Sequence, residues 1–261
     1  MPRPSVRANL VLRRLRRGVA VFGPNLQIPS PELIEIIALA GFDFVMLDGE
    51  HGAAFSRLPD LLVACDAAGL TSIVRVPSHE RSVLLPPLEL GAGGLQVPFV
   101  NTAEQARAIV RECKFPPLGE RGVSTVTRAA RWGHVDGRTY RQISNRQTIL
   151  ILQLETREAV ENADEIARVP GVDALFIGPA DLAQSYGHRA DKVTAPTIRV
   201  VARLMRRLAP IVPFGISASN RRDVARWHRL GARSFLTSSV FPLRNAFCGV
   251  RDELHSGLPA R

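Results

Sequence analysis

Short apolar runs alternate with longer amphipathic stretches along almost the whole chain. The apolar runs have the length and β-branched content of buried strands, and the longer stretches carry apolar residues at helical spacing. The pattern predicts eight strands, over residues 19–23, 44–47, 72–76, 94–98, 148–154, 174–177, 213–217 and 234–237. It also predicts helices that include residues 30–40, 56–68, 102–113, 157–168 and 220–230, several of which begin at a capping Ser, Thr or Asn.

Eight strand–helix repeats in 261 residues favour a closed (β/α)8 TIM barrel of the α/β class over an open doubly wound sheet. We expect one domain over residues 1–261, with an apolar helical tail near residues 240–250 used in oligomerisation. Neither GxGxxG nor GxxxxGK[ST] follows a predicted strand, so dinucleotide and P-loop chemistry have no support. Residues 115–124 form a long irregular connection, which in a compact domain is usually functional or flexible.

Two of the apolar runs end on a carboxylate. The run 149–154 is followed by Glu155, and the run 174–177 leads through Gly178, Pro179 and Ala180 to Asp181. Positions 155 and 181 are 26 residues apart, which fits one strand, one helix and the next strand, so the carboxylates are expected at neighbouring strand ends. Two oxygen ligands without Cys or His suit Mg²⁺, Mn²⁺ or a similar divalent ion.

The second and third predicted strands also end in ionisable residues. Asp48, Glu50 and His51 lie within four positions after residue 47, and a neighbouring carboxylate can orient an imidazole and raise its basicity. The segment is equally compatible with a capped loop in which His51 bonds only to backbone. Arg75 interrupts the third apolar run and needs an anionic partner, either a structural carboxylate or a substrate carboxylate. All these residues fall at the carboxyl ends of strands, where barrel enzymes place their active sites.

Lysine usage restricts the chemistry of such a site. The chain has only two lysines, Lys114 after a predicted helix and Lys192 in a polar segment. A Schiff-base aldolase needs a desolvated lysine on a barrel strand, and neither position supplies one. If the site makes or breaks carbon–carbon bonds, a metal ion must therefore act as the electron sink.

The formal charge of +10 raises the question of nucleic-acid binding. The excess arginines lie at the N-terminus and on predicted helix faces, without a zinc finger, an RNA-binding sheet motif or interleaved aromatics, so a solvated surface is the better interpretation. Cys65, Cys113 and Cys248 are widely spaced and odd in number, which favours a reducing, cytoplasmic compartment. No signal-peptide pattern and no run of 18 apolar residues is present, so no membrane partner is expected.

Several segments together resemble the HpcH/HpaI family of class II pyruvate-dependent aldolases, whose members include 2,4-dihydroxyhept-2-ene-1,7-dioate aldolases. They are GFDF (41–44), DGEH (48–51), VRVP (74–77), QVP (96–98), PPLGERG (116–122), QLETREA (153–159) and FIGPADL (176–182). The resemblance spans residues 19–246, in order and at matching intervals.

This resemblance implies a TIM-barrel lyase that reversibly cleaves a 4-hydroxy-2-oxo acid to pyruvate and an aldehyde through a metal-stabilised enolate. By position, Glu155 and Asp181 match the ligands of a divalent ion (Mg²⁺, Mn²⁺ or Co²⁺), and Gln153 matches a residue near the metal. Arg75 matches the arginine that neutralises the enolate, and His51 with Asp48 matches the base for the hydroxyl proton. Backbone amides around Gly178, Pro179 and Ala180 are then expected to receive the substrate carboxylate.

Two positions depart from the family pattern. Glu89 stands where family aldolases often carry an Asp that reaches toward a neighbouring subunit's site, so its catalytic role there is open. Ser217 stands where the sugar-acid aldolases tend to have an aliphatic residue facing the aldehyde, so aldehyde specificity cannot be carried over. Family members are often hexamers, arranged as trimers of dimers, with exchanged C-terminal helices, and the apolar tail is compatible with that assembly.

Two alternative functions remain open at this stage. Some relatives condense oxaloacetate with acetyl-CoA to make citrate for siderophores, and Glu89 together with the segment 91–98 keeps that reaction possible. A non-enzymatic, basic nucleic-acid scaffold is the other alternative, but it leaves Arg75 and the strand-end carboxylates without a purpose. The sequence leaves the aldehyde, the stereochemistry, the native metal and the physiological direction undetermined.

Overall fold

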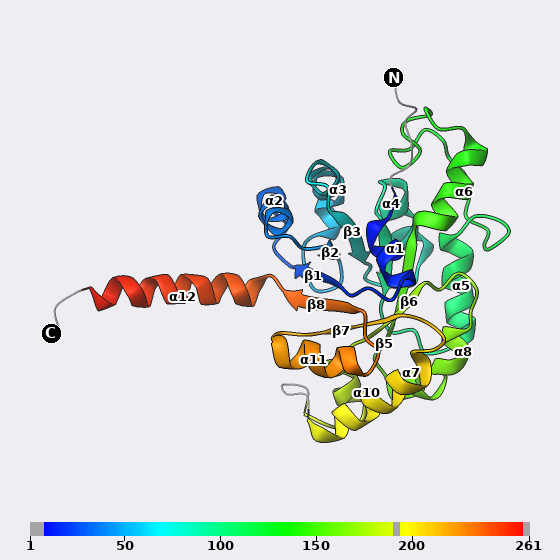
Figure 1. Ribbon diagram of the computed structural model, residues 1–261. Coiled ribbons are helices and arrows are strands. Elements are labelled where there is room, and N and C mark those ends of the chain that lie inside the picture. Colours follow the sequence, from blue (N-terminus) through cyan, green and yellow to red (C-terminus); the bar gives the residue numbers. More distant parts are fainter. Residues whose placement is uncertain (1–7, 190–193, 258–261) are drawn as a thin grey trace.

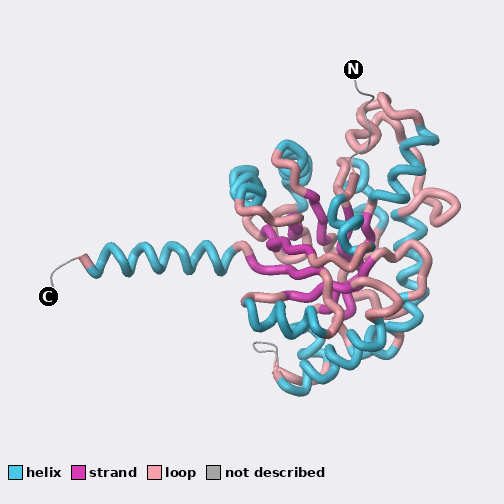
Figure 2. The backbone as a smooth tube through the Cα atoms, viewed as in Figure 1, coloured by secondary structure: helices cyan, strands magenta, loops and turns pink. Residues whose placement is uncertain are grey.

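A computed structural model, which describes residues 8–189 and 194–257, shows a closed barrel of eight parallel strands surrounded by helices (Figures 1 and 2). The strands are β1 (Val21–Leu26), β2 (Phe44–Asp48), β3 (Thr71–Arg75), β4 (Gly94–Val97), β5 (Ile149–Leu154), β6 (Ala174–Ile177), β7 (Phe214–Ser217) and β8 (Ser234–Ser238). Each strand pairs with the next, and β8 closes the barrel on β1. The predicted TIM barrel and its eight strands are confirmed, with boundaries shifted by at most three residues.

The two-residue period of the strands divides the core into two layers. Outward residues such as Val45, Leu152 and Ile216 pack with the surrounding helices in one large cluster. Inward residues such as Met46, Ile151 and Phe176 form a second cluster inside the barrel. Along β2 and β5 the inward positions are apolar at first and polar at the carboxyl end, and in β3 the inward Ile73 is followed by Arg75. The same alternation that fills the barrel therefore also directs polar and charged side chains to its mouth.

Helix α1 (Leu10–Arg16) closes the amino-terminal end of the barrel, and the sequence pattern did not identify it. Val11, Leu12 and Leu15 are buried in the inner cluster. The arginines of this helix face outward, where Arg14 pairs with Asp43 and Arg16 pairs with Asp173 at 3.1 Å. The described part of the basic N-terminal segment is therefore the solvent-exposed face of the helix that closes this end of the barrel.

Most predicted helices are present. Helices α2 (Pro31–Leu39), α3 (Leu58–Ala67), α5 (Ala103–Cys113) and α11 (Arg221–Arg229) match their predictions closely, with a short 3-10 turn η1 (Phe55–Arg57) before α3. The helix expected over 157–168 is instead two helices, α7 (Arg157–Glu161) and α8 (Ala163–Ala167), because Asn162 leaves helical geometry at φ −92° and ψ 4°. The pattern did not identify α4 (Arg81–Glu89), α6 (Gly137–Gln147), α9 (Pro179–Ser185) and α10 (Ala195–Leu208). Two prolines inside α4, Pro86 and Pro87, explain why that segment did not look helical.

The last helix, α12 (Val240–Ser256), leaves the barrel after β8 and projects away from it (Figure 1). None of its residues is buried, and Phe241, Phe247 and Leu254 are 60%, 68% and 71% exposed. The C-terminal segment from Val240 to Ser256 is thus a helix without contacts that bury it in its own chain. In the described ranges, no helix has both the length and the apolar character needed to cross a membrane.

Lys114 follows α5 at the amino-terminal end of the strands, opposite the barrel mouth. Its side chain is 1% exposed, and its Nζ donates to Thr148 O at 2.6 Å and pairs with Asp173 Oδ2 at 3.0 Å. It therefore links the residues that precede β5 and β6, and it is unsuited to Schiff-base chemistry at the mouth. Lys192 lies outside the described residues.

Candidate active site

Arg75 and Asp48 form the best-ordered ion pair at the barrel mouth. Parallel pairing of β2 with β3 places the two residues directly opposite each other, both on the inward face. Arg75 Nε donates to Asp48 Oδ1 at 3.0 Å and Nη2 donates to Oδ2 at 2.6 Å, a bidentate arrangement with Asp48 fully buried. Asn25 Nδ2 donates to the same Oδ2 at 2.8 Å. Burial raises the pKa of Asp48, but these hydrogen bonds outweigh it and hold the pKa below its ordinary value.

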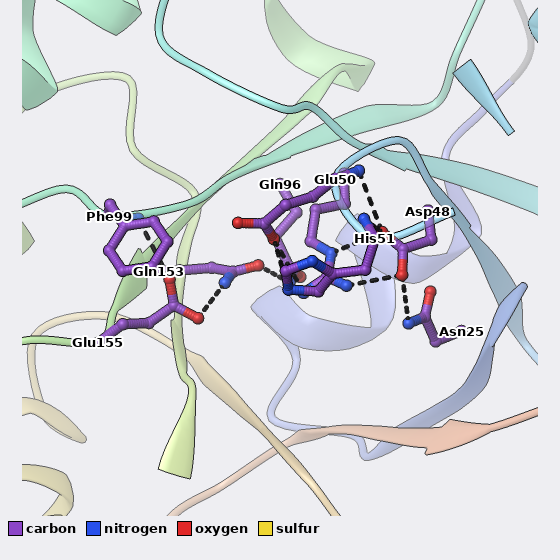
Figure 3. Close-up of polar contacts among 9 residues, drawn as sticks. Asn25, Asp48, Glu50, His51, Gln96, Phe99, Gln153 and Glu155 are labelled. Atoms are coloured by element: carbon purple, nitrogen blue, oxygen red, sulfur yellow. Dashed lines mark hydrogen bonds and ion pairs between the residues drawn. The ribbon is translucent and has the colours of Figure 1, made fainter. Parts of the chain in front are cut away.

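The loop after β2 places Glu50 and His51 beside this pair (Figure 3). Asp48 Oδ1 accepts from the backbone amides of Glu50 and His51, at 3.2 and 3.0 Å, so Asp48 holds the loop rather than the imidazole. The carboxylate nearest the ring is Glu50, whose Oε2 lies 3.7 Å from His51 Nε2 and 3.1 Å from Arg75 Nη1. His51 is 58% exposed at the rim, so its ring can meet a ligand that enters the barrel mouth.

Glu155 lies directly after β5 and is 3% exposed. Its Oε2 accepts from the Phe99 amide at 3.2 Å, and its Oε1 accepts from Gln153 Nε2. Gln153 in turn accepts from Gln96 on the neighbouring strand β4, so two amide side chains lead to the carboxylate (Figure 3). Phe99 adopts a positive φ of 52°, which aims its amide at Glu155. The carboxylate is thereby fixed from two sides.

Asp181 and the segment before it line, together with Glu155, a cavity of about 310 Å³. Gly178 follows β6 and lies so close to Glu155 that a side chain there would meet its Cγ at 2.8 Å and its Cδ at 3.0 Å. Glycine is required because the backbone passes directly over the carboxylate. Asp181 follows in the first turn of α9, where an acidic side chain suits the helix dipole.

The carboxylates of the mouth act on one another electrostatically. Burial, together with the negative charges of Asp181 and Glu50, raises the pKa of Glu155 to about 7 against the opposing hydrogen bonds from Phe99 and Gln153. Burial also raises the pKa of Glu50, with Asp48 and Asp181 adding to the shift and Arg75 and His51 opposing it. The site thus holds more negative charge than its single arginine neutralises.

This excess of negative charge fits a divalent cation. In the part of the chain that the structure describes, no group of three or more His, Cys, Asp or Glu residues forms a complete metal cage. Glu155 and Asp181 would supply two carboxylate ligands, and the cavity has room for waters and a ligand to supply the others. One or two carboxylates with several waters is the usual environment of Mg²⁺ in proteins. A bound cation would also offset the charge that raises the pKa of Glu155.

The structure brings most of the predicted residues to one cavity and separates one of them from it. Asp48 and His51 border the ion pair, and the cavity lining includes Arg75, Gln153, Glu155, Gly178, Pro179, Ala180, Asp181 and Ser217. Glu89 instead ends α4, beside the turn that leads into the start of β4, and so lies at the opposite end of the barrel in its own chain. A role for Glu89 in a neighbouring subunit's site stays a prediction.

Sequence reasoning did not assign roles to Asn25, Gln96 and Phe99, and it named Glu50 only as one of the ionisable groups around His51; all four contact the site. For Asn25 and Gln96 a signal was available, because each is a polar residue at an inward position near the end of an apolar strand. Phe99 contributes only its backbone amide, for which side-chain identity gives no indication.

A parallel barrel with an acidic mouth, a largely enclosed arginine and a cavity at its carboxyl end defines an enzyme of the TIM-barrel class. The sequence model of the HpcH/HpaI aldolase/citrate lyase family matches residues 25–232, and the chain belongs to that family. Similar proteins include the 4-hydroxy-2-oxovalerate aldolase of Novosphingobium aromaticivorans, 39% identical over 87% of this chain and 86% of the relative. The 2-keto-3-deoxy-L-rhamnonate aldolase of Klebsiella pneumoniae is 40% identical over 77% of this chain and 75% of the relative. The protein is accordingly an aldolase-type carbon–carbon lyase.

Solved structures show the same architecture. Citrate synthase SbnG superposes with a TM-score of 0.85 at 27% identity, covering 96% of this chain and 99% of its own. The citrate lyase β subunit of Mycobacterium tuberculosis, solved with oxaloacetate and magnesium, superposes with a TM-score of 0.55 at 19% identity. This superposition covers 86% of this chain and 93% of the β subunit. The second likeness shows the shared fold alone.

Proposed function

We propose that the protein cleaves a 4-hydroxy-2-oxo acid reversibly to pyruvate and an aldehyde, with a divalent ion (Mg²⁺, Mn²⁺ or Co²⁺) held by Glu155 and Asp181. The observation that carries the proposal is the buried Glu155, whose pKa of about 7 reflects burial and negative neighbours in a cavity that also contains Arg75. A cation bound there would serve as a Lewis acid for the 2-oxo group of the substrate.

Cleavage requires a base on one side of the substrate and positive charge on the other. The C4 hydroxyl loses its proton, the C3–C4 bond breaks, and the bonding electrons move to the C2 oxygen of the nascent enolate. His51, at the exposed rim, takes the hydroxyl proton through water, while Arg75 stabilises the developing negative charge. Asp48 and Glu50 hold the guanidinium in place for that task.

The substrate carboxylate would bind at the start of α9. Pro179 has no amide hydrogen, so the donors in this segment are the backbone amides of Gly178, Ala180 and Asp181. The first amides of a helix have no partner within the helix and favour negative charge. Gln153 would orient the neighbouring Glu155 through the hydrogen bond described above.

Exchange of the pyruvate methyl protons in D₂O tests this proposal, because exchange needs the enolate but no aldehyde. We expect exchange by the wild-type protein with Mg²⁺, Mn²⁺ or Co²⁺, its loss in Glu155→Gln, and its retention in Glu165→Gln, which alters an exposed residue of α8. Pyruvate release from a 4-hydroxy-2-oxo acid should follow the same order. Absence of both reactions in the metal-loaded wild type would overturn the proposal.

Citrate formation from oxaloacetate and acetyl-CoA is the second candidate, favoured by the 96% coverage of this chain in the superposition on citrate synthase SbnG. The two candidates can be separated by offering both substrate pairs to one preparation. Citrate formed without added metal, together with no methyl exchange, would establish the second candidate in place of the first.

We further propose a homo-oligomer, as a hexamer built from a trimer of dimers, in which α12 packs on another subunit. Leu243 and Phe247 line an apolar groove on α12, and Ile36 and Leu39 on α2 are 60% and 88% exposed. Exposed apolar surface of this kind usually marks a protein interface. Sedimentation equilibrium should give six times the chain mass, and Phe247→Glu should lower it, whereas Glu253→Gln should not. A wild-type monomer would contradict the proposal.

Two finer proposals concern partners and compartment. We propose a small oxo acid as the ligand, with no nucleic-acid or membrane partner, and a cytoplasmic location. Part of the basic surface is used within the chain, as in Arg81 with Glu112 and Arg207 with Asp164. An electrophoretic shift of DNA or RNA at physiological salt would contradict the first proposal. Cell fractionation would test the second.

A further inference from the structure

Gln96 is a buried amide that the proposed chemistry does not use. It is the inward residue of β4 between the outward-facing Leu95 and Val97, and only 3% of its surface is exposed. The described residues that line the cavity at the mouth include Gln153 but not Gln96, so a ligand in that cavity does not contact Gln96. Burying a polar amide costs free energy unless hydrogen bonds compensate for it. An amide at this position therefore needs a partner within the barrel.

Strand register places Gln96 between a cation and a carboxylate of the mouth. On one side it pairs in register with Arg75 of β3. On the other side lies β5, which carries Gln153 on the same inward face. Gln96 Nε2 donates to Gln153 Oε1, and Gln153 Nε2 donates to Glu155 Oε1 (Figure 3). The two amides are thus aligned in one direction, each with its nitrogen toward Glu155.

The direction of the Gln153 amide decides what it offers to Glu155. An amide has a donor end and an acceptor end of nearly the same shape, whereas an ionised carboxylate only accepts. A reversed Gln153 would therefore place its oxygen against an oxygen of Glu155. Gln96 fixes the favourable direction, because it gives the Gln153 oxygen a donor on the side away from the carboxylate. Removing the Gln96 amide would take that donor from a buried oxygen, which is costly.

The charges that flank the two amides favour the same direction. A cation attracts the oxygen end of an amide dipole, and an anion attracts its nitrogen end. Arg75 lies beside Gln96 on β3, and Glu155 follows β5, so both charges favour amide nitrogens that face the carboxylate. An apolar side chain in place of Gln96 would remove the first of the two dipoles.

We infer that Gln96 is a positioning residue of this enzyme, which fixes the direction of the Gln153 amide and thereby holds Glu155 in place for the divalent ion. The inference rests on the proposed function, because it takes Glu155 as a ligand of that ion. Gln96 acts on metal binding through Gln153 and not by contact with the ion. Partners that orient a metal ligand typically contribute about 10–100-fold to metal affinity.

Titration calorimetry of the full chain with Mn²⁺ alone tests the inference. Gln96→Met keeps the approximate length of the side chain and removes the donor, so the Kd for Mn²⁺ should rise about tenfold. Gln142→Met, which alters an exposed glutamine of α6, is the matched control and should bind Mn²⁺ as the wild type does. Gln96→Leu should show the same loss as Gln96→Met. A loss confined to Gln96→Met would indicate a packing defect and would overturn the inference.

A double-mutant cycle separates positioning through Gln153 from a general effect on the barrel. Gln153→Met alone should raise the Kd for Mn²⁺ about 10–100-fold. Adding Gln96→Met to this variant should raise the Kd by less than about twofold more, because the residue through which Gln96 acts is already absent. A merely structural role of Gln96 would instead give a similar loss in both backgrounds, since independent effects add.

The outcomes distinguish this inference from the proposed function. An unchanged Kd in Gln96→Met or in Gln153→Met, or a further tenfold loss in the double variant, would overturn the inference while the wild type still bound Mn²⁺. A wild type that does not bind Mn²⁺, or Glu155→Gln that binds it as tightly as the wild type, would overturn the metal site of the proposed function, and the inference with it.

Discussion

Lys114 lies at the amino-terminal end of the strands and Arg75 lies at the carboxyl end, and each is a buried cation beside carboxylates. At the base, Lys114 and Asp173 form a pair of opposite charges that balance each other, and Asp173 also accepts from the exposed Arg16 and from the Leu150 amide. At the mouth, Arg75 faces Asp48 and Glu50, with Glu155 and Asp181 across the cavity. Balanced buried charge is what a structural site needs. An excess of one sign persists where a ligand or cation will supply the other.

The largest effect is expected at the base. Lys114→Met would leave Asp173 facing one exposed arginine, and breaking a buried pair by removing one partner costs about 3–5 kcal/mol of unfolding free energy. Urea unfolding should show this loss, while kcat per folded molecule stays near wild type because the mouth is untouched. A marked fall in kcat with normal stability would contradict the assignment of a structural role to the base and a catalytic role to the mouth.

Next in size is the effect of Arg75→Lys at the mouth. Lysine keeps the positive charge but cannot bind Asp48 through two hydrogen bonds while it also pairs with Glu50. The cation is therefore no longer held in a fixed position beside the enolate. We expect kcat/KM for pyruvate release to fall roughly 10²–10³-fold. Arg111→Lys, on the exposed face of α5, is the matched control and should retain activity. Full activity in Arg75→Lys would show that this residue is structural, as Lys114 is.

Glu155 should make the metal-free protein pH-sensitive. Its pKa is about 7 in the folded state against an ordinary value of 4.5, so the folded state holds a proton that the unfolded chain has lost between these values. The free energy of unfolding should therefore fall as pH rises from about 4.5 to 7, by about 3 kcal/mol at most. In EDTA, Glu155→Gln should be more stable than wild type at pH 8, with the difference disappearing near pH 4. Equal stability of Glu155→Gln and wild type at both pH values would show that the pKa of Glu155 is not raised in the folded protein.

The smallest effect is expected from Gly178→Ala. The added methyl group would meet Glu155 Cγ and Cδ and push the carboxylate from its position. Metal affinity measured by calorimetry should fall about 10–100-fold, the usual cost of disturbing the support of a metal ligand. Gly249→Ala is the matched control and should bind metal normally, because Gly249 lies on α12 with open space around it. Gly187 is unsuitable as a control because its φ of 69° disfavours alanine. Unchanged affinity in Gly178→Ala would place the metal away from Glu155.

Much of the mouth was predictable because strand alternation is a local property of the sequence. Asp48, Arg75, Gln153 and Glu155 each follow an apolar run at an inward position, and parallel register brings such positions to one end of the barrel. The pairing of side chains was less predictable. Asp48 holds Arg75 and the backbone of His51, whereas the sequence suggested an Asp48–His51 pair, because the loop after β2 turns its amides toward Asp48.

By itself, the sequence determined the eight strand–helix units, the acidic strand ends and the presence of only two lysines, since each follows from residue type and spacing along the chain. Tertiary structure decided which groups share a partner. It placed Lys114 and Glu89 at the base, closed that base with α1, brought Asn25, Ser217 and Ser238 to the lining of one cavity, and directed α12 away from the barrel. These outcomes depend on which strands close the barrel and how loops turn, and such contacts join residues that are far apart in the chain.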